Sequence, residues 1–145
     1  MKYSIFLFVL PLLCGAQKPE QIYPFARYHY STDYLKKQAE LWKEETERSP
    51  SNANAWYNYY YANRNLYLAD TTRVGREKQW EKTGNLLDAM AKSIPESYEY
   101  NLCRWLHGGW DMKLIAHLRK AQALGPDRPE HVDFSIVLAE IDNVI

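Results

Sequence analysis

Apolar residues recur at helical spacing through most of the chain after residue 32. Between residues 33 and 48 they form a single stripe, made by Leu35, Ala39, Trp42 and Thr46 at positions i, i+4, i+7 and i+11. This spacing predicts an amphipathic helix with one buried face. Lysine and glutamate residues four positions apart occupy the other face, where such pairs support a solvated helix.

The next stretch, residues 53–67, carries aromatic residues on two faces of a predicted helix. A helix of this kind is either sandwiched between neighbours or lines a groove. The pattern breaks over residues 67–76, which include Gly75, so this stretch is expected to be a loop. A third helix is expected over residues 76–93.

Three more helices are predicted towards the C-terminus. The fourth follows Pro95, a residue that suits the first position of a helix, and ends at Gly108 and Gly109. Asp111 is expected to cap the fifth helix, and a sixth begins at Pro129. Residues 17–32 have no period and contain two prolines, which predicts an extended N-terminal arm packed across the helices.

Two sets of markers suggest a repeat. Trp56, Tyr98 and Val132 are 42 and 34 positions apart, and Pro50 and Pro126 are 76 apart. Both sets fit units of 34 residues with one eight-residue insertion at residues 67–76. Alternating helices with a period of this length are typical of helical repeat proteins.

The pattern resembles the tetratricopeptide repeat, and in particular the N-terminal repeat region of exported bacterial proteins of that family. The resemblance covers residues 33–145 and rests on Trp56, Tyr98, Leu118, Ala121 and Pro126. It implies an all-α fold of stacked antiparallel helical hairpins, an α-solenoid of about six helices. The implied units are residues 53–94 with the insertion, residues 95–128, and a partial unit at 129–145.

The first sixteen residues have the features of a secretory signal peptide. Lys2 precedes an apolar run at residues 5–13, and the small residues Gly15 and Ala16 follow. The run is shorter than the about 20 residues that a membrane-spanning helix needs. We therefore expect cleavage after Ala16 and export to the periplasm or the exterior, without a transmembrane span; lipidation at Cys14 is the disfavoured alternative, because Leu13 is large.

The charge and cysteine content narrow the choice of partners. The chain has 18 basic and 18 acidic residues, so it lacks the basic footprint of a nucleic-acid-binding protein. After cleavage Cys103 is the one remaining cysteine, which excludes an internal disulfide. A buried apolar thiol is the expected role for Cys103.

The resemblance also implies a concave groove, formed by the first helices of the units, that binds a partner segment. Carried over position by position, the groove residues are Asn54, Tyr57, Tyr61, Arg64, Glu99, Cys103, His107 and Asp133. The alternative is that the N-terminal arm packs on the two tyrosines and occupies the groove itself.

Catalytic and metal-binding chemistry finds no support in the sequence. There is no phosphate-binding glycine loop, no HExxH and no GxSxG. His107 and Asp111 flank a Gly-Gly turn, and a role as a helix end and a helix cap explains them. No cofactor or metal is expected.

The expected function is that of a non-catalytic scaffold in the cell envelope, holding a protein, a peptide or a further domain that follows Ile145. Two alternatives stay open. The 12 tyrosines and 5 tryptophans, Trp80 and Trp110 among them, could stack on sugar rings in a glycan-binding module. The chain could also be the N-terminal helper region of a longer exported enzyme.

Overall fold

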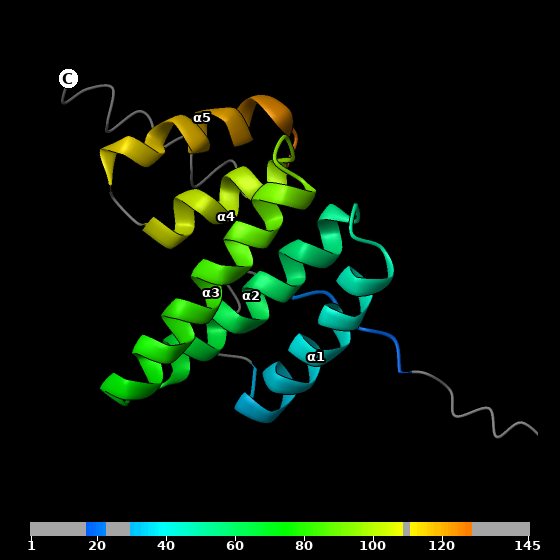
Figure 1. Cartoon of the computed structure of the whole chain (residues 1–145), viewed down its shortest axis with the longest axis vertical. Helices are drawn as coiled ribbons and strands as arrows, with labels where there is room; N and C mark the ends of the chain where they lie inside the picture. The colour runs from blue at the N-terminus through cyan, green and yellow to red at the C-terminus, as the bar shows by residue number, and fades with distance from the viewer. Residues whose placement is uncertain (1–16, 23–29, 109–110, 129–145) are drawn as a thin grey trace, which may run out of the picture.

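The computed structural model describes residues 17–22, 30–108 and 111–128, and the part it describes is entirely helical apart from turns and the short N-terminal segment (Figure 1). The prediction of an all-α protein is confirmed for these residues. The predicted sixth helix from Pro129 and the arm residues 23–29 lie outside them. The elements are α1 (Thr32–Arg48), α2 (Ala53–Ala69), α3 (Arg73–Ser93), α4 (Tyr98–Gly108), the 3-10 turn η2 (Met112–Leu114) and α5 (Ile115–Leu124).

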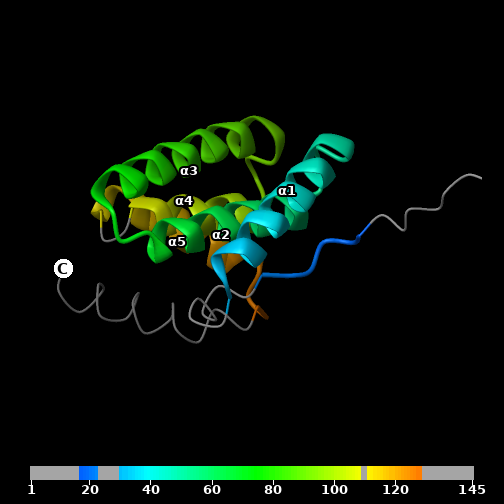
Figure 2. The ribbon, with the colours of Figure 1, turned by 90° about the horizontal axis from the view of Figure 1, so that it is seen from below.

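Helix α2 lies at the centre of the described fold. It packs against α1, α3 and α4, while α5 packs against α4. Figure 2 shows α3 running along one side of α2 and α4. The positions of these helices decide which faces of the molecule are left for binding.

Helix α1 forms as its hydrophobic stripe predicts. The hydroxyl of Ser31 accepts a hydrogen bond from the backbone N–H of Tyr34 and so caps its start. The four stripe residues are all buried, and Gln38 is buried on the same face. On the other face Lys43 and Glu47 form an exposed ion pair at 3.3 Å.

Helix α2 is buried on nearly all sides, which confirms the sandwiched alternative. Tyr57, Tyr59, Tyr60 and Tyr61 are all buried, and so are several asparagines. The Asn63 amide donates to the Tyr59 carbonyl oxygen at 2.8 Å, whereas its own side-chain oxygen and both polar atoms of the Asn65 side chain are buried without a hydrogen-bond partner among the described residues. A helix in this position has to bury polar groups, and each of them needs a partner.

The loop predicted over residues 67–76 is wrong. Helix α2 continues to Ala69, and α3 begins at Arg73, three residues earlier than predicted. The Asp70 carboxylate accepts from the backbone N–H and the hydroxyl of Thr72, and the Thr72 hydroxyl accepts from the N–H of Gly75. These capping bonds allow a tight turn between α2 and α3. The residues that were expected to form a loop instead extend the two helices.

Two predicted helix starts also move. Helix α4 begins at Tyr98, because the Ser97 hydroxyl accepts from the Tyr100 N–H at 3.0 Å, and Pro95 lies in the preceding turn. The Asp111 carboxylate accepts from the Lys113 N–H at 2.9 Å and so caps η2 rather than α5. At α4 a local side-chain cap outweighs the proline that the sequence favoured as the first residue of the helix, whereas Asp111 does act as a cap, but for the 3-10 turn that precedes α5.

Candidate functional site: a groove that holds the N-terminal segment

The predicted groove residues that the structure describes lie mostly inside the fold. Tyr57 and Tyr61 are 3% and 2% exposed, and Cys103 is fully buried. Glu99 and His107 are buried as well, Arg64 is half-buried and Asn54 is exposed, while Asp133 lies outside the described residues. In this conformation the two tyrosines offer almost no surface to a partner.

The buried tyrosines and Cys103 form part of the core between α2 and α4. The rings of Tyr57 and Tyr61 are 4.6 Å apart, and Tyr60 meets Tyr61 edge-on at 5.8 Å. Burial raises the pKa of Tyr61 and of the Cys103 thiol well above their usual values. A thiol held in its protonated form and out of solvent is not a nucleophile.

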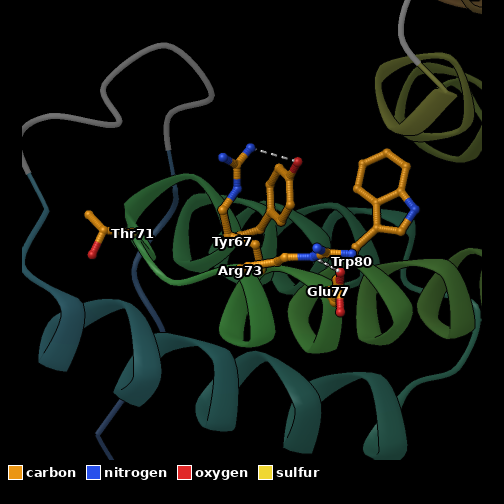
Figure 3. Close-up of a pocket in the computed structure, with 6 residues that line it drawn as sticks. Tyr67, Thr71, Arg73, Glu77 and Trp80 are labelled. Carbon is orange, nitrogen blue, oxygen red and sulfur yellow. Dashed lines mark hydrogen bonds and ion pairs between the residues drawn. The ribbon is translucent and has the colours of Figure 1, made fainter.

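At the turn between α2 and α3, four flat groups form a row. The Arg76 guanidinium lies 4.9 Å from the centre of the Tyr67 ring, Tyr67 lies 5.4 Å from Trp80, and Trp80 stacks on His107 at 3.8 Å. Tyr67 and Trp80 line a shallow cavity of about 500 Å³ together with Thr71, Arg73, Arg76 and Glu77 (Figure 3). The row links α2, α3 and α4.

Trp80, which the sequence offered as a residue that could stack on a sugar ring, is 43% exposed. The His107 ring covers one of its faces at an interplanar angle of 16°. His107 is also 3.3 Å from the Thr83 hydroxyl, and burial lowers its pKa, with the nearby Arg104 and Arg64 acting in the same direction. The imidazole is therefore a neutral stacking partner at neutral pH.

The clearest binding geometry lies on the opposite side of α2, where residues 17–22 cross α1 and α2. We call these residues the docked segment. The N–H of Glu20 donates to the side chain of Gln38 at 2.7 Å, and the indole N–H of Trp42 donates to the Glu20 carbonyl at 2.8 Å. The N–H of Ile22 donates to the Asn58 side chain at 2.6 Å. Helix side chains thus hold the main chain of this segment at three points.

Side chains add to this main-chain contact. Ile22 is fully buried. The Tyr34 hydroxyl donates to the Glu20 carboxylate at 3.0 Å, and burial, followed by this hydrogen bond and the carboxylate charge, raises the pKa of Tyr34 to about 12. We refer to Tyr34, Gln38, Trp42 and Asn58 together as the segment groove.

A hollow of about 470 Å³ continues from the groove beside residues 17–19. Leu41, Trp42, Glu44 and Glu45 line it from α1, together with Arg48. Asn52 and Asn54 line it from the start of α2. Asn54 is therefore the predicted groove residue that the structure places beside a bound segment, and its side chain also accepts from the Asn58 amide at 3.2 Å.

Sequence reasoning missed Gln38, Asn58 and Tyr34 as binding residues, although two of them carried a signal. Gln38 lies on the apolar stripe of α1, and Asn58 lies in the middle of the most buried helix. A polar side chain at a buried position needs a hydrogen-bond partner. Here the partners are the backbone N–H groups of the docked segment.

Within the described residues there is no group of three or more histidine, cysteine, aspartate or glutamate side chains that could hold a metal ion. None of the described helices is both long enough and apolar enough to cross a membrane. No known protein family, curated protein or solved structure matches this chain.

Proposed function

We propose that this protein is a non-catalytic helical scaffold that holds an extended segment of a protein partner in the segment groove. The observation that carries the proposal is the way in which α1 and α2 bind the main chain of residues 17–22 through Gln38, Trp42 and Asn58. Main-chain hydrogen bonds give affinity for an extended peptide, and side-chain pockets give specificity. The groove offers both.

The localisation, the type of helical repeat and the kind of partner that we propose are those indicated by the sequence. The chain is exported after cleavage behind Ala16, the helices form hairpins like those of tetratricopeptide repeats, and the partner is a separate protein or a domain beyond Ile145. The signal-peptide pattern, the helical period and the all-α fold of the described residues support this setting. With cleavage at that position, the mature chain begins with the docked segment.

Glycan binding has less support. A sugar ring needs an open aromatic face, and five of the nine tyrosines that the structure describes are buried. Trp80 is the most exposed tryptophan among the described residues, but His107 covers one of its faces and Tyr67 lies 5.4 Å from its ring. The row at the α2–α3 turn uses its aromatic faces internally.

The proposal is tested by emptying the groove and offering the segment as a separate peptide. Ile22→Asp in the full chain places a carboxylate in a fully buried position, whose desolvation cost drives the segment out of the groove. A synthetic peptide QKPEQI with an amidated C-terminus is then titrated in by calorimetry. Saturable binding to the variant, with at least tenfold weaker binding to the parent chain, is the expected result.

A scrambled peptide of the same composition is the control. Absence of binding at millimolar peptide, with the helical circular dichroism spectrum unchanged, would overturn the proposed function.

A second measurement, hydrogen exchange, does not depend on the variant. In the parent chain, the amides of Glu20 and Ile22 should exchange with solvent faster than those of α2 but slower than free peptide, because the segment detaches without global unfolding.

A further inference from the structure

We propose that the segment groove selects its ligand, and that the partner presents an acidic residue followed two positions later by a branched aliphatic residue, as Glu20 and Ile22 do. This inference rests on the proposed function and names the kind of partner. Tyr34 is the residue that selects the carboxylate, and the site that buries Ile22 selects the aliphatic side chain.

The contacts of Glu20 carry the first half of the inference. Its N–H, its carbonyl oxygen and its carboxylate each meet a different side chain of α1, namely Gln38, Trp42 and Tyr34. The first two contacts are made by main-chain groups, so any residue could make them. The third requires a side-chain acceptor of the right length, and a carboxylate is the stronger acceptor for a hydroxyl donor.

The spacing of the two residues carries the second half. Side chains in an extended segment alternate between two sides, so residues 20 and 22 face the same side and residue 21 faces the other. Glu20 and Gln21 are both exposed while Ile22 is fully buried, so the groove holds the Glu20 carboxylate at its rim and the isoleucine inside. The N–H groups of Glu20 and Ile22 also both donate into the helices. One residue between the acidic and the aliphatic position is therefore what this groove accommodates.

The charges around the hollow beyond Glu20 disfavour a partner that is acidic throughout. Glu44 and Glu45 line it against one arginine, Arg48, which is already paired with Glu45 at 2.8 Å. Gln17, Lys18 and Pro19 of the docked segment line this hollow with them, and Lys18 is the charged residue of the three. The groove thus favours a single carboxylate at the position of Glu20 and disfavours negative charge nearer the N-terminus of the ligand.

The experiment uses the full-length Ile22→Asp chain and variants of the QKPEQI peptide. Replacing the peptide glutamate by alanine should weaken binding about threefold, the loss expected for a solvent-exposed contact to a charged group. Replacing the isoleucine by aspartate should abolish binding, whereas valine should keep most of it. A peptide of acidic residues alone should not bind.

A double-mutant cycle assigns the carboxylate to Tyr34. Adding Tyr34→Phe to the receptor should weaken the binding of the parent peptide. It should leave the binding of the glutamate-to-alanine peptide unchanged, because that peptide offers no carboxylate for the Tyr34 hydroxyl to bind. Tyr100→Phe is the matched control. It removes a hydroxyl from a half-buried tyrosine of α4, away from the groove, and should change neither affinity.

The outcomes separate the two proposals. Equal affinity for all the peptides would overturn the selectivity and leave the scaffold function standing. Binding of none of them to a folded receptor would overturn both.

A second copy of this chain is the other occupant that the experiment has to distinguish. If the parent chain forms dimers in analytical ultracentrifugation that Ile22→Asp abolishes, the partner is another copy exchanging its segment, and the inference of a separate partner is wrong.

Discussion

Two fully buried aliphatic side chains, Ile22 and Leu102, offer a direct test of how the docked segment is held. Both are 0% exposed, but Ile22 lies in a terminal segment and Leu102 lies inside α4. Truncation of each to alanine removes three carbons. The same change in chemistry is expected to have different consequences, because one residue can leave with its segment and the other cannot.

The magnitudes follow from the two environments. Leu102→Ala should lower the free energy of unfolding by about 2–5 kcal/mol, since a rigid core collapses only partly around the cavity. At Ile22 the transfer of three carbons gives about 2.4 kcal/mol, and detachment of the segment sets an upper limit to the loss. Ile22→Ala should therefore cost less than Leu102→Ala.

Urea unfolding followed by far-ultraviolet circular dichroism measures both values, and hydrogen exchange at the amides of Glu20 and Ile22 measures local detachment. Ile22→Ala should speed exchange at these two amides far more than in α2. A cost for Ile22→Ala equal to or larger than that of Leu102→Ala would mean that the segment unfolds only together with the core. The reasoning that treats it as an exchangeable ligand would then be refuted.

Three further predictions follow from the described residues. Tyr57→Ala together with Tyr61→Ala should lower the melting temperature strongly, because each removes a buried ring and a large aromatic truncation costs about 3–5 kcal/mol; an unchanged melting temperature would return these rings to a binding surface. Since burial lowers the pKa of His107 below 6.5 in the folded state, the neutral form is favoured. The free energy of unfolding is therefore not reduced by this histidine above pH 6.5, and it falls as the pH drops from 6.5 through the lowered pKa of folded His107. Urea unfolding between pH 5 and 8 should show a smaller decrease for His107→Gln than for the parent chain. Cys103 should resist a thiol reagent in the native chain and react fully in denaturant, as mass spectrometry can show.

The turn between α2 and α3 shows where prediction from sequence failed. Gly75 suggested a loop, but it lies in the first turn of α3, where a Cβ atom would overlap the carboxylate of Asp70. The glycine is needed for a close approach rather than for a break in the helix. Helical periodicity cannot distinguish these two roles, because both depend on which side chain lies opposite in space.

The predicted groove residues show a related difficulty. The resemblance to the tetratricopeptide repeat placed Tyr57 and Tyr61 on the concave surface, whereas both are buried in the structure. A helix with aromatic residues on two faces does not itself reveal which face is open. The single hydrophobic stripe of α1, by contrast, was predicted correctly. One-sided patterns define a buried face; two-sided patterns leave the partner of each face to the tertiary structure.

Covalent attachment sets the condition that any partner has to meet. The docked segment ends at Ile22 and α1 begins at Thr32, so covalent attachment over this short stretch gives the segment an effective concentration in the millimolar range. A partner present at micromolar concentration must therefore bind about a thousandfold more tightly than the docked segment to occupy half of the grooves. Copying the contacts of Glu20 and Ile22 is not sufficient for this. The hollow beside residues 17–19, which reaches Asn54, is where a longer segment can gain additional contacts. Under the proposed cleavage after Ala16, the chain's own segment would begin at Gln17 inside this hollow. A partner segment that continues further in the same direction would then fill more of the hollow, and these additional contacts would give it a means of displacing the docked segment.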